Sequence, residues 1–301
     1  MQSLASRGIF VGCSSWKYEG WLGQIYSPSL YRTRGKFSKK LFEETCLSEY
    51  AGIFPTVCGD FAFYQFPSES FWAKLFRQTH TDKIPAFQWA FKVPEQITAA
   101  AWPVHPRYGA LAGLENPTFL DAVLFEAAFL RTLSPYQQQV GVLIFEFGTF
   151  RERTFGSAGD FVRALDPFLA RLPDGWRYAV EIRNAEFLTP RYFDCLRAHG
   201  VTHVFNAWAR MPEIGEQMAM PGSRTADMVV ARALLRRGRP YEDAVRKFSP
   251  YSEIQEVNEP VRKALREMVI EAQVEGRPAF IYVNNRLEGN SPGTIVVVTE
   301  E

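Results

Sequence analysis

Charged side chains end several short apolar runs of this sequence, namely Lys92, Glu146, Glu181, Arg183 and Arg232. Carboxylates can transfer protons when burial and neighbouring charge tune their pKa, so Glu181, Lys92 and Glu146 are candidate catalytic residues. Lys92, Arg183 and Arg232 are cations of the kind that binds carboxylate or phosphate, and arginine binds such groups through two parallel hydrogen bonds. The residue types predict a site for a small anionic or polyhydroxylated substrate, and a reaction of the hydrolase or lyase kind.

Amide and aromatic side chains lie near the same run ends. Asn206, Asn284 and Asn285 are candidates for hydrogen bonds to substrate oxygens, and Trp16, Trp21 and Tyr64 for stacking on a flat or sugar-like face. An alternative for Glu181 and Arg183 stays open. They are two residues apart, so an extended backbone places both on one face, where they could form a structural ion pair.

The apolar runs predict eight strands that alternate with amphipathic helices. We expect strands at 9–13, 58–64, 87–92, 140–146, 178–183, 202–206, 227–231 and 279–284, and helices at 118–133, 160–172, 190–200 and 260–275. Alternating parallel units of this number predict an α/β fold, a TIM-type (β/α)8 barrel, with one domain over 1–301. A doubly wound open sheet is the alternative, but no glycine-rich nucleotide motif follows any strand. In a barrel, the strand ends that carry the charges share one mouth.

Composition limits the class of protein. The 301 residues hold 34 Lys+Arg and 33 Asp+Glu, with 47% hydrophobic residues, which excludes wholesale disorder. No apolar run is long enough to span a membrane, and no signal peptide is recognisable. Four cysteines without C-x-x-C spacing predict reduced thiols and a cytoplasmic location. The basic segment 232–247 is either a solvated helix face or an anion-binding lip.

Two other functions stay open. A metal-dependent nuclease or isomerase would need ligands at the strand ends, but the four histidines, His80, His105, His199 and His203, do not lie there, so we expect no metal and no cofactor. A non-catalytic module that binds nucleic acid or a metabolite could use the 232–247 segment, although the near-neutral net charge disfavours nucleic acid. A glycosidase using Glu146 and Glu181 is disfavoured by Arg232 on the seventh strand.

At these motifs the sequence resembles the YecE-like family (domain of unknown function 72). The resemblance rests on Gly12-Cys13-Ser14-Ser15-Trp16-Lys17-Tyr18, Phe63-Tyr64, Phe91-Lys92-Val93-Pro94, 141–147, Glu181-Ile182-Arg183 and Tyr282-Val283-Asn284-Asn285. It implies a barrel and no particular reaction. Departures from the family pattern are Ser15, Cys58, Asp60, Ala62, Glu146 and an altered helix start at Ser291-Pro292-Gly293, which suggest a divergent member with an altered pocket.

Overall fold

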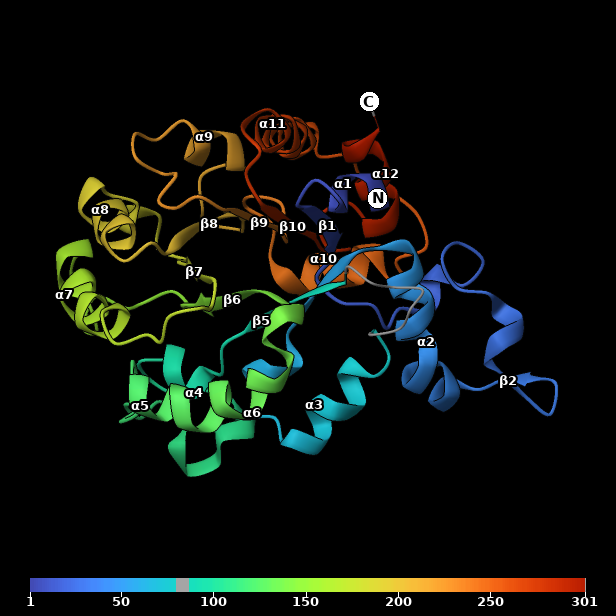
Figure 1. The fold of residues 1–301 in the computed structure, drawn as a ribbon, viewed down its shortest axis with the longest axis horizontal. Helices are drawn as coiled ribbons and strands as arrows, with labels where there is room; N and C mark the ends of the chain where they lie inside the picture. Colours follow the sequence, from blue (N-terminus) through green and yellow to red (C-terminus); the bar gives the residue numbers. More distant parts are fainter. Residues whose placement is uncertain (80–86, 301) are drawn as a thin grey trace.

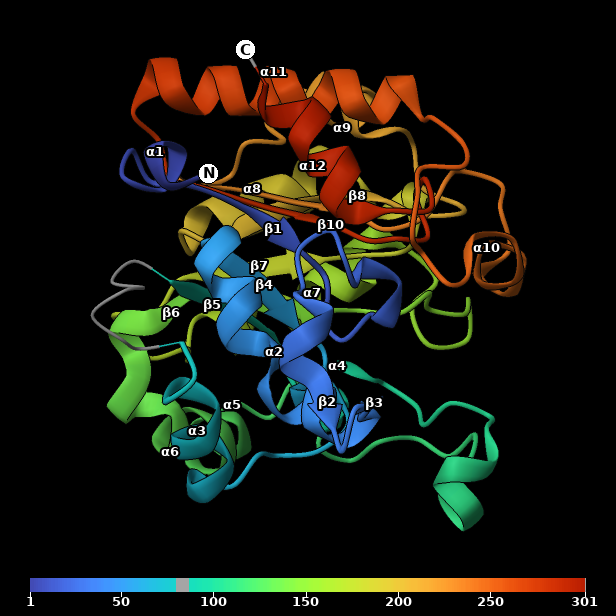
Figure 2. The ribbon, with the colours of Figure 1, turned by 90° about the vertical axis from the view of Figure 1, so that its right-hand side faces the viewer.

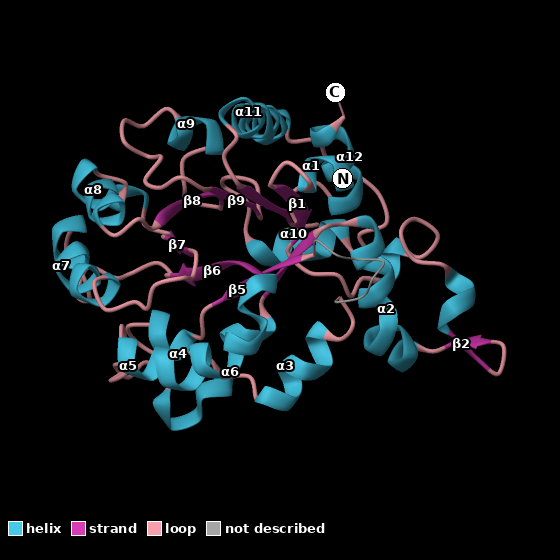
Figure 3. Ribbon diagram, viewed as in Figure 1, coloured by secondary structure: helices cyan, strands magenta, loops and turns pink. Residues whose placement is uncertain are grey.

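Eight parallel strands close into a barrel in the computed structural model, which describes residues 1–79 and 87–300 (Figures 1 and 3). The strands are β1 (Ile9–Cys13), β4 (Thr56–Gly59), β5 (Gln88–Lys92), β6 (Val140–Glu146), β7 (Tyr178–Glu181), β8 (Thr202–Ala207), β9 (Val229–Ala233) and β10 (Ala279–Val283). The ring closes where β1 pairs with both β10 and β4. A separate hairpin joins β2 (Arg32–Thr33) and β3 (Lys36–Phe37). The predicted (β/α)8 barrel is confirmed.

Helices surround the barrel (Figure 1). They are α1 (Gln2–Ala5), α2 (Lys39–Ile53), α3 (Glu69–Phe76), α4 (Glu95–Thr98), α5 (Ala122–Leu124), α6 (Arg131–Leu133), α7 (Ala158–Leu169), α8 (Pro190–Ala198), α9 (Ile214–Met218), α10 (Tyr241–Phe248), α11 (Glu259–Glu275) and α12 (Ser291–Thr299). Thr189 caps α8 ahead of Pro190, and the positive φ of Gly200 and Gly276 follows the ends of α8 and α11. Ser291 and Pro292 begin α12, so the departure there does not prevent a helix.

Three predicted strand boundaries were wrong, and each affects the site. The second strand is 56–59, not 58–64, because the chain turns at Gly59, where a Cβ would lie 2.7 Å from the Phe61 ring. The seventh predicted strand, 227–231, is 229–233, since its pairing with β10 places Arg232 beside Tyr282 inside the strand. The predicted 178–183 strand ends at Glu181, which leaves Arg183 in the following loop.

The predicted helix 118–133 begins later and is irregular. Asn116-Pro117 has the residue types of a helix start, but Asp121 caps this helix by accepting a 2.9 Å hydrogen bond from the Leu124 amide. Residues 125–130 form a π-helix between α5 and α6. The Asn116 side chain instead donates to the carbonyl oxygens of Gln96 and Ala99, at 2.9 and 2.7 Å. Asn116 therefore holds the loop after α4 against that helix.

The barrel interior has an apolar layer with charged residues at one end. Nine buried residues form the layer: Cys58, Ala90, Val142, Ile144, Ala179, Val204, Val230, Phe280 and Tyr282. Because side chains alternate along a strand, the next inward position on β5, β6, β7 and β9 holds Lys92, Glu146, Glu181 or Arg232. The strand carboxyl ends therefore present charge above an apolar floor.

Long loops extend the barrel at this charged end. Figure 2 shows the segment between α4 and α5 reaching outward on the same side of the molecule as α10, which follows β9. All four cysteines are buried and none is disulfide-bonded. Within the described residues, no helix combines the length and apolarity needed to cross a bilayer.

His203 predicts a pH dependence of stability. It lies in β8, fully buried, with its Nδ1 3.2 Å from the Tyr192 hydroxyl, and burial lowers its pKa to about 3. The unfolded chain binds a proton near pH 6.5 that the folded chain does not, so His203 favours folding above pH 6.5 and loses this contribution as the pH falls toward 3. We expect His203→Gln to remove about 1.4 kcal/mol per pH unit from the slope of unfolding free energy below pH 6.5.

Urea titrations at about pH 7.5 and 5.5 measure this slope. Identical slopes in the wild-type protein and the variant would contradict the assignment. The comparison of slopes cancels the contributions of other carboxyl groups.

Candidate functional site

Five charged side chains meet at the carboxyl end of the barrel. Glu146 accepts contacts at 3.1 Å from both Lys92 Nζ and Arg183 Nη2. Glu181 is bound by Arg183, whose Nη2 and Nε lie 2.8 and 2.9 Å from its Oε1. Arg232 Nη1 bridges Glu146 and Glu181. The structure thus joins the predicted charged residues into one continuous network.

Strand register brings these residues together. Glu146 and Glu181 are direct neighbours across β6 and β7, and Arg232 is flanked by Asn206 on β8 and Tyr282 on β10. Arg232 reaches across the barrel from β9 to the two glutamates. The closed ring therefore supplies the carboxylates from one side and the guanidinium from another.

The network keeps Glu146 and Arg232 ionised despite their burial. Burial opposes ionisation of Glu146, but Arg183, Lys92 and Arg232 outweigh it and hold the pKa of this carboxyl well below its ordinary value. Burial likewise opposes the charge of Arg232, and Glu181 and Glu146 more than compensate, so its pKa stays above the ordinary value. Both groups remain charged across the physiological pH range.

The network has a surplus of positive charge. Three cations, Lys92, Arg183 and Arg232, face two carboxylates, Glu146 and Glu181, so 3 − 2 = +1. Lys92 Nζ also lies 4.0 Å from the centre of the Phe63 ring, and the Arg183 guanidinium 3.7 Å from that of Trp208. Both contacts come from loops beyond the strands, so these two cations form the outer part of the network.

A cavity of about 310 Å³ opens beside Glu146. Its walls come mainly from the loops after β5 and β6, and the lining side chains include Glu95, Tyr108, Arg151 and Arg153. Arg151 and Arg153 are exposed, and neither forms an ion pair with any residue that the structure describes. We call this space the mouth cavity.

Glu95 is a site residue that the sequence interpretation missed. It begins α4 three residues after Lys92, its exposed fraction is 3%, and its Oε2 accepts a 2.6 Å hydrogen bond from the Tyr108 hydroxyl. Burial raises the pKa of Glu95. Its place in the long 93–116 segment after the third strand was the available signal, because barrel enzymes carry functional groups in such loops.

The three asparagines are all buried, and each is held by hydrogen bonds to the chain itself. Asn206 is fully buried and donates to the Ile182 carbonyl oxygen at 3.1 Å, so it is enclosed below the mouth. Asn285 is buried and accepts hydrogen bonds from the Ser291 amide and hydroxyl at 2.7 and 2.9 Å, which hold the start of α12. Asn284 uses its Oδ1 for the Arg286 amide at 3.0 Å. Both asparagines after β10 therefore organise the closing loop.

The three predicted stacking aromatics do not share one surface. Trp21 is fully buried against Tyr18 and Tyr26, so it cannot meet a substrate. Trp16 is buried and lines a different cavity, of about 340 Å³, between α2 and α3. Tyr64 is 47% exposed and follows η3 (Phe61–Phe63) instead of ending a strand.

Tyr64 nevertheless lies near the mouth cavity. Its ring centre is 4.1 Å from the guanidinium of Arg107, which neighbours the cavity residue Tyr108. Of the three aromatics, Tyr64 is the one placed beside this cavity.

The basic segment 232–247 is largely neutralised. Arg236 and Arg239 pair with Glu256 at 3.0 and 2.8 Å, and Lys247 contacts the same carboxylate. Arg237 pairs with Glu216 at 3.1 Å. Arg232 belongs to the barrel network and not to this surface, so the segment is not a continuous cationic lip.

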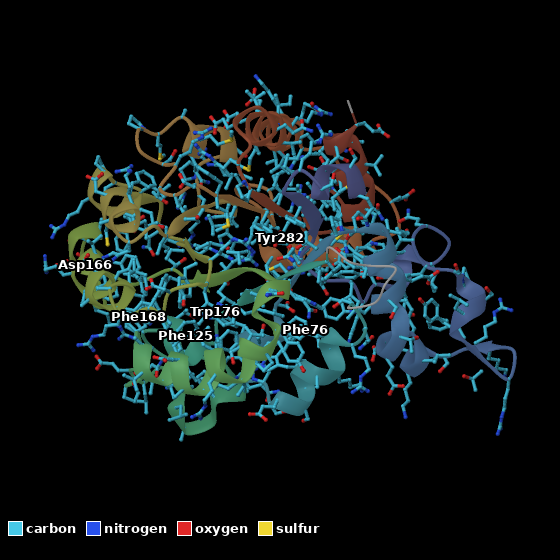
Figure 4. All side chains as sticks on the ribbon, in the orientation of Figure 1. Phe76, Phe125, Asp166, Phe168, Trp176 and Tyr282 are labelled. Atoms are coloured by element: carbon cyan, nitrogen blue, oxygen red, sulfur yellow. The ribbon has the colours of Figure 1, made fainter. Side chains whose placement is uncertain are left out.

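Of the described histidines, His105 lies beside the mouth cavity, whereas His199 and His203 lie elsewhere. His105 accepts a hydrogen bond from the Arg107 amide, and its ring centre is 6.5 Å from that of the cavity residue Tyr108. His203 lies in β8, with its Nδ1 3.2 Å from the Tyr192 hydroxyl, and His80 falls outside the described residues. His199 lies 2.8 Å from Asp166, and with Cys195 these two form the metal-capable group found in the described part of the chain. This group lies between α7 and α8, and Figure 4 shows its Asp166 at the outer edge, away from the barrel residue Tyr282.

The charge surplus makes a prediction about stability. Glu181→Gln would leave three cations with one carboxylate, and removing one partner of a buried ion pair costs about 3–5 kcal/mol of unfolding free energy. Lys92→Met would leave two cations with two carboxylates, so we expect less than half that loss. Urea denaturation of both variants checks this ordering. An equal loss of unfolding free energy in the two variants, or a larger loss for Lys92→Met, would show that the surplus of positive charge does not affect stability.

Comparisons with known proteins identify the family. The model of the "Protein of unknown function DUF72" family matches residues 10–301. A DUF72 protein of Thermotoga maritima has a TM-score of 0.59 and 19% identity, over 96% of each chain. One of Enterococcus faecalis has the same TM-score and 15% identity, over 96% of this chain and 94% of its own. No curated protein gives a significant match. These matches confirm the resemblance drawn from the motifs, and the chain belongs to the DUF72 family.

Proposed function

We propose that this protein is an enzyme of the hydrolase or lyase kind that acts on a small anionic substrate in the mouth cavity. The observation that carries the proposal is the charge of this end of the barrel. The network has a net charge of +1, and the neighbouring Arg151 and Arg153 add two exposed cations without ion-pair partners among the described residues. An anion bound there would gain charge-assisted hydrogen bonds with little competition.

The three network cations are all buried, and they differ in the groups that surround them. Arg232 is enclosed between two carboxylates and serves to hold them in place. Lys92 and Arg183 lie at the outer edge of the network, beside the aromatic faces of Phe63 and Trp208. We assign substrate contact to Lys92, Arg183, Arg151 and Arg153, and a positioning role to Arg232 and Glu181.

The size of the mouth cavity supports a small substrate. Its volume of about 310 Å³ is at the lower end of the range typical of small-molecule sites. Aromatic faces of Phe63, Trp102 and Phe150 line it together with the charged groups. This combination suits a compact molecule that carries a carboxylate or phosphate at one end and a less polar or hydroxylated part at the other.

The alternative functions receive less support. A nucleic-acid module would use the 232–247 segment, whose cations are mostly paired with Glu216 and Glu256. A metal-dependent nuclease or isomerase would need ligands at the mouth. The grouped ligand set of the described residues lies instead between α7 and α8.

Calorimetric titration with inorganic phosphate tests the proposal. We expect wild-type protein to bind phosphate, and Lys92→Met and Arg153→Ala each to weaken binding about tenfold or more, since hydrogen bonds to charged groups contribute about 1.5–3 kcal/mol. Arg171→Ala removes an exposed arginine beyond the end of α7 and is the matched control. Turnover is then sought by mass spectrometry in a panel of sugar phosphates and sugar acids.

Two outcomes would contradict the proposal. The first is that phosphate does not bind the wild-type protein, and the second is that it binds equally to all four proteins. Either result would remove the electrostatic basis for an anionic substrate.

A further inference from the structure

The mouth cavity is lined by two carboxyl groups in opposite electrostatic settings. Glu146 contacts three cations, whereas Glu95 forms no ion pair with the residues that the structure describes, and its hydrogen-bond partner is the neutral Tyr108 hydroxyl. Pairs of carboxyl groups held in different protonation states are a recurrent feature of acid–base sites. This contrast assigns the two groups different roles.

We propose that Glu95 is the proton donor of the mouth site and that the reaction there breaks a carbon–oxygen bond whose leaving oxygen Glu95 protonates. This inference rests on the proposed function and adds to it the catalytic residue and the type of bond cleaved. Glu95 lines the cavity and is therefore placed to touch a substrate bound there.

Local structure fixes the Glu95 side chain. Glu95 follows Pro94 directly at the start of α4, and Tyr108 from the next loop holds its Oε2 at 2.6 Å. Asn116 ties the same loop to the Gln96 and Ala99 carbonyl oxygens. A proton donor needs this kind of fixed geometry, because proton transfer requires hydrogen-bond distance to the reacting atom.

The charged and titratable neighbours of Glu95 are few. The Tyr108 hydrogen bond, Arg107 and Lys92 favour the carboxylate, but burial favours the neutral acid more strongly, so the pKa of Glu95 is raised. A glutamic acid with a raised pKa retains its proton closer to neutral pH, where it can donate it.

The other two carboxylates of the mouth are poor proton donors. Glu181 is fully buried and bound by two arginines, so it is out of reach of a substrate. Glu146 reaches the cavity, but its three cations keep it ionised. Both residues position Lys92, Arg183 and Arg232, so neither combines access to the cavity with a proton to donate.

The proposed step balances in either reaction class. The carbon–oxygen bond breaks, its electron pair stays on the leaving oxygen, and the Glu95 proton moves to that oxygen. In hydrolysis, a water molecule adds to the carbon and releases its second proton to solvent. In elimination, the neighbouring carbon instead loses a proton to solvent, and the electron pair of that carbon–hydrogen bond forms the carbon–carbon double bond. Solvent then returns a proton to Glu95, so no oxidant, reductant or other reactant is needed.

Infrared difference spectroscopy tests the protonation of Glu95 without a substrate. The carbonyl stretch of a protonated carboxylic acid is followed between about pH 4 and 8 in wild-type protein and Glu95→Gln. We expect a band in the wild type that titrates above the ordinary glutamic acid value of about 4.3 and is missing in the variant. Glu267→Gln, an exposed residue of α11, is the control and should retain the band.

Tyr108→Phe provides a second variant whose effect has a definite sign. The Tyr108 hydroxyl stabilises the ionised form of Glu95, so its removal should move the titration of the band to higher pH. This variant keeps Glu95 and decides the question if Glu95→Gln does not fold. Wild-type spectra that match those of Glu95→Gln, or a Tyr108→Phe titration that does not move, would overturn the inference.

Catalysis and binding separate this inference from the proposed function. With a substrate found in the panel, Glu95→Gln should lower kcat by about 10²- to 10⁴-fold. This decrease should be smallest for substrates whose leaving group is a stable anion, because such a group needs no proton. The affinity for phosphate should stay within about twofold of the wild-type value. Phosphate binding without a Glu95 band would overturn the proton donor alone. A Glu95 band without phosphate binding would overturn the proposed function.

Discussion

Five charged side chains share the interior of the barrel mouth, and direct ion pairs among them compensate for their burial. Transfer of a single charge out of water costs several kcal/mol, so Glu181 is tolerated at zero exposure because Arg183 and Arg232 contact it directly. The same contacts fix the position of Glu146, which belongs both to the network and to the mouth cavity. Pairing of the buried charges therefore determines which groups face a ligand.

The barrel divides support and accessibility between two levels. The apolar layer, capped by Tyr282 hydrogen-bonded to Thr56 at 3.2 Å, gives the network a dry floor. The loops above it supply the accessible groups, Glu95, Arg151 and Arg153. The charged residues of the strands are mostly paired with one another, whereas the loop residues retain polar atoms that can bind a ligand. This arrangement is typical of (β/α)8 barrels, in which the strands hold the site in place and the loops after them supply residues that contact the substrate.

Strand periodicity predicted the fold and the charged cluster well, because eight apolar runs with polar ends have few other solutions. It placed Lys92, Glu146, Glu181 and Arg183 correctly near one another. It could not show that Glu181 is sealed by arginines, since the pairing crosses the barrel from β9 to β6 and β7. Trp16 and Trp21 were misjudged because aromatic residues look alike in sequence whether they fill a core or line a site. Glu95 was missed because its burial depends on Tyr108, thirteen residues along a loop without periodicity.

A crystal structure of the protein grown with inorganic phosphate tests the central claim most directly. The account predicts that Lys92, Glu146, Glu181, Arg183 and Arg232 form one connected network. It also predicts phosphate in the mouth cavity, in contact with Lys92 or Arg183 and with Arg151 or Arg153. Side chains of these five residues directed into separate regions, or phosphate bound only elsewhere on the molecule, would contradict it.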